Sequence, residues 1–168
     1  MARTVEQFVK ECKAILGKEN NPAGRKKICA MLEEYLKDAS FVEATLNDKV
    51  SERTILYEDP DLGFCVLGHN YKGEKGSPPH DHGPAWAIYG QARGVTEMTD
   101  WDLVEPASEQ KAGKVRQKKV YKLTPGMAYV YNEKDLHSPY RAGSTSLIRI
   151  EGQNMDKVKR LRFEAIAA

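Results

Sequence analysis

The chain has 168 residues, a length that fits one domain and is too short for two domains of ordinary size. Charged residues make up 30% and hydrophobic residues 40%, a composition typical of a soluble globular protein. The 26 basic and 24 acidic residues leave a formal net charge of +2, so charge gives no argument for a nucleic-acid or membrane partner. No apolar run approaches the roughly 20 residues of a membrane span, and the charged N-terminus lacks a signal-peptide pattern.

Two amphipathic helices are predicted at the start of the chain. Thr4 is a candidate N-cap for the first, because apolar residues recur at helical spacing over 5–16. The run 17–20 then breaks the pattern with Gly, Lys, Glu and Asn. A second helix is predicted to start at Asn21, with Pro22 in its first turn. Each helix would bury one stripe, so we interpret the pair as a cover that packs on the rest of the fold.

From about residue 52 the sequence favours short strands. The β-favouring runs are Thr54–Tyr57, Phe64–Leu67, Trp86–Tyr89, Val95–Trp101, Val115–Leu123, Met127–Tyr131 and Ser146–Ile150. Turn-forming residues separate them and no helical pattern intervenes, which indicates a β-sandwich or barrel. The tail over 158–166 is predicted either as a last strand or as a short helix. We therefore expect one mainly β domain over 1–168, with a helical cover over 1–40 and a β-barrel over 50–168.

The cysteines bear on the cellular compartment. Cys12, Cys29 and Cys65 are odd in number and widely spaced, so they form neither a disulfide framework nor a thiolate metal site. Free cysteines fit a reducing environment, and we expect a cytoplasmic protein.

The histidines carry the strongest chemical signal. His80 and His82 lie two residues apart, and in an extended segment such residues point to the same face. Two imidazoles on one face can share a metal ion. Taken alone, a His-x-His pair is more often a surface coincidence, so the interpretation depends on its surroundings.

Those surroundings resemble the cupin superfamily, whose first motif holds a His-x-His pair and a closing glycine. His80-Asp-His82 is followed by Gly94 at the place of that glycine. In the second motif a glycine precedes a histidine by eleven residues, as Gly126 precedes His137. The resemblance implies a jelly-roll barrel, also called a double-stranded β-helix, and a metal ion held by His80, His82 and His137.

Two departures from the motifs narrow the resemblance. Asn132 and Lys134 replace the proline and glycine within the second motif. The glutamate ligand of the first motif would fall at Trp86 or Ala87, so the site contains histidines alone. An all-histidine cupin site resembles that of the thiol dioxygenases, of which cysteine dioxygenase is the best known.

Further segments are similar to the thiol dioxygenases. The stretch 80–101 is similar to the family's HDH segment, and 51–57 is similar to the approach to its barrel. In that approach the family places an arginine that pairs with the substrate carboxylate, and Arg53 stands at about this position. Arg53 is therefore predicted either to bind a substrate carboxylate or to be an ordinary surface or ion-pair arginine.

The family's supporting Ser–His–Tyr relay and its cross-linking cysteine are not matched. Ser146 fits the serine, but Ile148 and Ile150 occupy the places of histidine and tyrosine, and Ala87 that of the cysteine. A tyrosine can still enter the site from another strand, and Tyr89 and Tyr131 are the predicted catalytic candidates. Weaker candidates for the pocket or its surroundings are Tyr129, Tyr140, His69 and Glu97.

The expected cofactor is Fe(II), with zinc, nickel or manganese as alternatives, because imidazole suits several of these ions. Three neutral imidazoles leave the full +2 charge on the ion, which favours anionic ligands such as thiolate and carboxylate. The resemblance implies an oxidoreductase that uses O2 and a small thiol, with or without a carboxylate. Two alternatives stay open: a metal cupin with non-oxidative lyase or isomerase activity, and a non-catalytic cupin that binds a metal or ligand. The sequence does not indicate the oligomeric state.

Overall fold

The computed structural model describes residues 2–167 and contains three α-helices, one 3-10 helix and ten strands within that range. The helices are α1 (Val5–Leu16), α2 (Pro22–Leu36), α3 (Ala39–Thr45) and the 3-10 helix η1 (Met155–Lys157). The strands are β1 (Thr54–Glu58), β2 (Cys65–Tyr71), β3 (Lys75–Gly76), β4 (Ala87–Arg93), β5 (Thr96–Glu105), β6 (Gly113–Leu123), β7 (Ala128–Tyr131), β8 (Leu136–Arg141), β9 (Thr145–Glu151) and β10 (Phe163–Ala165).

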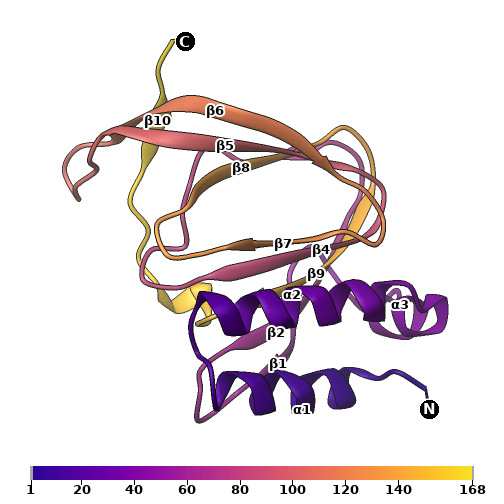
Figure 1. Ribbon diagram of the computed structural model, residues 1–168. Coiled ribbons are helices and arrows are strands. Elements are labelled where there is room, and N and C mark those ends of the chain that lie inside the picture. Colours follow the sequence, from indigo (N-terminus) through magenta and orange to yellow (C-terminus); the bar gives the residue numbers. More distant parts are fainter. Residues whose placement is uncertain (1, 168) are drawn as a thin grey trace.

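The strands form two five-stranded sheets that face each other. One sheet has the order β1-β2-β9-β4-β7, and the other has the order β10-β6-β5-β8-β3. All pairings are antiparallel except that of β10 with β6. In Figure 1 strands β4, β7 and β9 of the first sheet lie between helix α2 and the second sheet. The prediction of a mainly β jelly-roll barrel is confirmed.

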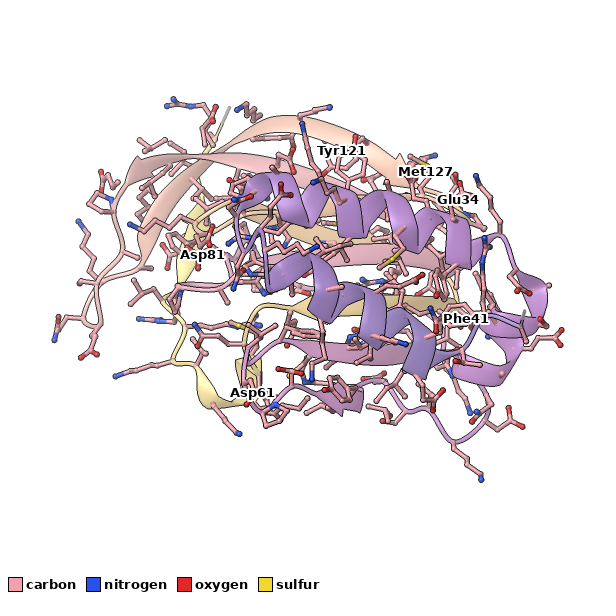
Figure 2. All side chains as sticks on the ribbon, turned by 60° about the horizontal axis from the view of Figure 1, so that its bottom comes forward. Glu34, Phe41, Asp61, Asp81, Tyr121 and Met127 are labelled. Carbon is pink, nitrogen blue, oxygen red and sulfur yellow. The ribbon has the colours of Figure 1, made fainter. Side chains whose placement is uncertain are left out.

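Local sequence explains where the two long helices begin. The Thr4 side chain accepts a hydrogen bond from the backbone N–H of Gln7, and the Asn21 side chain accepts one from that of Gly24. Both predicted N-caps are therefore confirmed. Figure 2 shows α1 and α2 lying across the sheet that they cover.

The fold has two apolar clusters of unequal size. The larger one joins the helices to the outer face of the first sheet and includes Leu32 from α2, Ile88 from β4 and Ile150 from β9. The smaller one lies on the inner face of that sheet and includes Ala87, Tyr89 and Tyr131. Strands β4 and β9 are buried on both faces because helices cover one side and the second sheet covers the other. Because the larger apolar cluster lies on the outer face of the first sheet, polar groups can lie in the interior between the sheets.

The structure adds strands β3 and β8 and helices α3 and η1 to the elements predicted from sequence. Strand β8 was missed because Pro139 lies within it, and proline weakens a strand prediction. Strand β3 has two residues and is too short to give a periodic pattern. The tail predicted as a last strand or a short helix contains the three-residue strand β10. The fold prediction gave two helices; the third, α3, has seven residues and starts at the N-cap Asp38.

Three positions of the two motifs adopt a left-handed backbone. Gly94 has φ +71°, and a Cβ there would lie 2.4 Å from the Ser144 carbonyl oxygen. Gly126 has φ +95° in a turn in which the Met127 N–H donates to the Thr124 carbonyl. Lys134, at the place of a family glycine, also has a positive φ, of 66°. The turn keeps the shape that glycine would give it, although lysine occupies the position.

Candidate metal centre

The three predicted ligands come together between the two sheets. His137 lies on β8, and His80 forms an isolated antiparallel bridge with it through two backbone hydrogen bonds of 2.9 Å. His82 follows in the irregular segment before β4. The sequence predicted an extended segment at both histidines, but only His80 pairs as a strand residue, in a one-residue bridge. Both histidines still point to the same side. Asp81 between them turns away and accepts a hydrogen bond from the Gly83 N–H; Figure 2 labels it at the end of the molecule opposite Phe41.

The imidazoles converge closely enough to share one ion. One ring nitrogen from each of His80, His82 and His137 lies within 4.8 Å of the others. The Nε2 atoms of His82 and His137 are 3.2 Å apart. Within residues 2–167 no aspartate, glutamate or cysteine joins this group. The group could hold a metal ion through imidazole nitrogen alone, as the sequence predicts.

Backbone carbonyls orient two of the three rings. Nδ1 of His80 donates to the carbonyl oxygen of Pro78 at 2.9 Å, and Nδ1 of His137 donates to that of Asp135 at 2.9 Å. A carbonyl oxygen accepts hydrogen bonds and does not donate them, so the proton lies on Nδ1 in both rings. Each Nε2 therefore presents its lone pair to the centre, which is the form that binds metal.

Burial keeps the three rings neutral. It lowers the pKa of His80 to about 4, and it lowers the pKa values of His82 and His137 well below their ordinary value. His82 is 1% exposed, and within the described chain its buried Nδ1 has no hydrogen-bond partner. Packing against Tyr89 and His137 thus orients this ring. Neutral imidazoles are the protonation state that a metal ion requires.

Of the two predicted tyrosines, Tyr89 places its hydroxyl at the centre. The Tyr89 hydroxyl lies 3.1 Å from Nε2 of His82 and 3.2 Å from Nε2 of His137. Tyr131 stacks its ring on His137 at 4.1 Å between centroids, but its hydroxyl bonds that of Tyr121 instead. Burial raises the pKa of both Tyr89 and Tyr131, so both phenols are protonated at neutral pH.

The structure does not bring Arg53 to the histidines. Its two terminal nitrogens donate to Glu151 at 2.9 and 3.0 Å, and its Nε donates to Asp156 at 3.1 Å. Its guanidinium is thus engaged by two carboxylates of the chain and lines a neighbouring pocket. A carboxylate-anchor role for Arg53 would require a substrate to displace these bonds.

The residues at the positions of the family's relay lie on the outer face of β9, away from the histidines. Ile148 and Ile150 pack in the cluster under the helices, not in the barrel interior. Since alternate residues of a strand face opposite sides, the interior side of β9 is formed by Leu147, Arg149 and Glu151. Arg149 is paired with Tyr89 across the sheet, and its guanidinium lies 4.1 Å from the Tyr89 ring centroid.

Two buried arginines that were not predicted from the sequence lie next to the centre. Arg141 on β8 is 1% exposed, and Arg149 is 9% exposed. Both line a pocket that also includes His80 and Tyr89. The available signal was Arg149 itself, which interrupts the apolar run Leu147–Ile150 in a strand buried on both faces.

The weaker candidates lie outside the centre. Tyr140 is exposed and bonds Glu74, Glu97 is exposed, and Tyr129 stacks on Tyr121. His69 is buried on β2 with its Nδ1 bonded to the Glu52 carbonyl. None of the four belongs to the histidine group.

Comparisons with known proteins find similarity among solved structures alone. No protein-family model and no curated protein matches the sequence. Among solved structures, a cupin superfamily protein from Desulfitobacterium hafniense is similar, with a TM-score of 0.46 and 10% identity over 61% of this chain and 76% of that one. KdgF from a Halomonas species has a TM-score of 0.45 and 17% identity over 63% and 82%. A cupin-2 domain protein from Shewanella frigidimarina has a TM-score of 0.43 and 14% identity over 64% and 86%.

The structure bears on two expectations from the sequence, that the cysteines form no disulfides and that the chain contains no membrane span. Cys12, Cys29 and Cys65 are all free thiols. Among the described residues, no helix is long and apolar enough to cross a membrane.

Proposed function

We propose that the protein is an Fe(II)-dependent oxidoreductase that dioxygenates a small thiol. The observation that carries this proposal is the donor set: three neutral imidazoles, two buried and one half-buried, with no carboxylate among them. Such a set leaves the full charge of a divalent ion to attract a thiolate, because the protein supplies no anionic ligand of its own. The sequence resemblance to thiol dioxygenases supports the choice of iron and thiol.

The net reaction adds both atoms of O2 to the substrate sulfur, so that RSH and O2 give the sulfinic acid RSO2H. Bound iron would supply the redox chemistry for this addition. The chain supplies positioning: backbone carbonyls fix His80 and His137, and the apolar residues around Tyr89 limit the access of water. The Tyr89 hydroxyl, close to two ligand nitrogens, is placed to donate a hydrogen bond to a group bound there.

Oxygen uptake tests the proposal. Protein loaded with Fe(II) under anaerobic conditions is mixed with oxygenated buffer and with cysteine, 3-mercaptopropionate or cysteamine in turn. We expect O2 consumption that requires both the thiol and Fe(II), with one sulfinate formed per O2. Protein loaded with zinc is the matched control and is expected to consume none.

Other outcomes separate the alternatives. Turnover of a carboxylate or carbonyl substrate by the zinc-loaded protein without oxygen would replace the proposal with Lewis-acid chemistry. Tight thiol binding without oxygen uptake would identify a ligand-binding protein.

A further inference from the structure

A pocket beside the histidines carries more positive charge than the chain neutralises. Its volume is about 430 Å³, which suits a small ligand. His80 and Tyr89 form the side nearest the metal centre, and Arg141 and Arg149 form part of the wall. The segment 160–164 closes another side as the chain crosses from one sheet to the other (Figure 1).

Arg141 is a buried cation without an anion. It is 1% exposed, and its Nε and Nη2 atoms find no acceptor among the described residues. Its guanidinium lies 4.5 Å from the ring centroid of Tyr71, a contact that offsets part of the lost hydration. Burial lowers the pKa of Arg141, yet a guanidinium stays charged at neutral pH. An unpaired buried charge is costly, so this position favours a ligand that brings a negative charge.

Arg149 is only partly neutralised. The nearest carboxylate oxygen belongs to Glu151 and lies 3.7 Å away. Glu151 already accepts two hydrogen bonds from Arg53, so one carboxylate serves two guanidiniums. The Nε of Arg149 is buried and, within residues 2–167, has no partner.

The rim adds further positive charge. Arg160 and Arg162 are exposed on the pocket wall and form no ion pair with the described residues. Among the described lining residues the one carboxylate is Glu164, which is paired with Lys114. The pocket therefore has at least two positive charges available to a ligand.

We propose that this pocket binds an oxyanion with two negative charges, such as the dicarboxylate or phosphate end of a substrate whose other end reaches the histidines. Arg141 and Arg149 come from different sheets, so they approach such a group from two sides. A single carboxylate would neutralise one guanidinium and leave the other without a partner. This inference deepens the proposed function by naming the substrate class and rests on it for the reaction, but anion binding itself requires no metal.

Ligand discrimination by the unmodified metal-free protein is the first test. Its Tm is measured with succinate, inorganic phosphate, propionate or chloride at matched ionic strength. We expect a dianion to raise Tm by about 4 °C or more near saturation, and propionate to raise it much less. A larger shift with succinate indicates a dicarboxylate, and a larger shift with phosphate indicates a phosphate monoester. Equal shifts with succinate, phosphate and propionate would overturn the proposal.

Substitutions assign the effect to the two arginines. Arg141→Met and Arg149→Met are expected to lose the dianion-induced shift, whereas Arg116→Met, which removes an exposed arginine on β6, keeps it. Without ligand, Arg141→Met is expected to melt at or above the temperature of the unmodified protein, because an unpaired buried charge is gone. A full dianion shift retained in Arg141→Met would contradict the assignment.

Metal content is measured on the same variants. Retained metal with a lost dianion shift supports the anion pocket, and an intact dianion shift in protein that binds no metal would contradict the proposed function alone.

Discussion

At the scale of single residues, the second nitrogen of two of the three imidazoles fixes the geometry of the centre. Carbonyl oxygens hold Nδ1 of His80 and His137, so Nε2 is free to act as a ligand. Tyr89 then adds a hydroxyl within hydrogen-bond distance of Nε2 of His82 and of His137. Tyr131 contributes a stacked ring but directs its hydroxyl toward Tyr121. The two tyrosines are thus predicted to differ in their effect on the reaction.

Tyr89→Phe removes the hydroxyl at the centre and keeps the ring. We expect kcat for thiol-dependent oxygen uptake to fall on the order of 10-fold to 100-fold, because a hydrogen-bond donor near the reacting groups is lost. Metal content is expected to stay unchanged. Tyr131→Phe is the matched variant and is expected to change kcat by less than about threefold, since its hydroxyl lies outside the centre. Equal effects of the two substitutions would contradict the assignment.

The histidines could be predicted from sequence because their spacing is local and the motif glycines mark the turns around them. Arg141 and Arg149 could not, because their placement depends on which face of β8 and β9 is turned inward. A shift of one residue along β9 exchanges the two faces, and Ile148 and Ile150, at the places of the family's relay residues, lie on the face that packs under the helices.

At the scale of elements, the turn before β8 positions His137. Arg25 on α2 reaches this turn through a bidentate pair with Glu133, at 2.7 Å for both bonds, and a bond to Asn132. The same guanidinium lies 5.2 Å from the Trp86 ring centroid. The helical cover therefore holds the turn from which His137 extends.

Lys134→Gly tests the strain in this turn. Lysine at φ 66° pays a steric cost that glycine avoids, although glycine loses more backbone entropy on folding. We expect the free energy of unfolding to rise by about 0.5 kcal/mol, measured by urea denaturation. Destabilisation of about 1 kcal/mol or more would show that the lysine side chain contributes to stability.

Asp59 links α1 to the turn between β1 and β2. It is 2% exposed, and its carboxylate accepts hydrogen bonds from the Tyr57 hydroxyl and from the backbone of Asp61 and Leu62, with Lys13 at 3.0 Å. Burial alone would raise the pKa of Asp59, but the hydrogen bonds outweigh burial and lower this pKa to about 2. The folded-state pKa lies below the unfolded value, so its contribution is present above about pH 4 and is lost as pH falls toward about 2.

Asp59→Asn is expected to destabilise the protein by about 2 kcal/mol at pH 7, since charge-assisted hydrogen bonds are lost. The difference from the unmodified protein should shrink between about pH 4 and pH 2. Urea denaturation of both proteins at pH 7, 4 and 2 measures it. A difference that stays constant over this range would show that the charge of Asp59 is not the source of the stability.

At the scale of the whole molecule, two faces of one sheet have different functions. The outer face packs on the helices and forms the larger apolar cluster, while the inner face carries Tyr89, Arg149 and Glu151. The sequence predicted both the helical cover and the barrel, because their periodicities differ clearly. It did not predict β8, the strand that carries His137, because Pro139 and the mixed polarity of 136–141 obscure the alternation.

Leu32→Ala separates the stability of the cover from the metal centre. Leu32 is fully buried on α2, and a Cβ added to Gly90 on β4 would lie 2.6 Å from its Cδ2, so the two elements pack closely. We expect a loss of about 3 kcal/mol in the free energy of unfolding, measured in urea. Metal stoichiometry of the folded variant is expected to stay unchanged. A loss below about 1 kcal/mol would contradict the close packing of α2 on the sheet.

The metal centre is tested most directly by metal stoichiometry after anaerobic Fe(II) loading and desalting. We predict one ion per chain for the unmodified protein and a loss of at least tenfold in metal affinity for His137→Ala. Replacing His69, a buried histidine outside the group, is predicted to leave the stoichiometry unchanged. Full iron occupancy in folded His137→Ala would contradict the assignment of His80, His82 and His137 as the metal ligands.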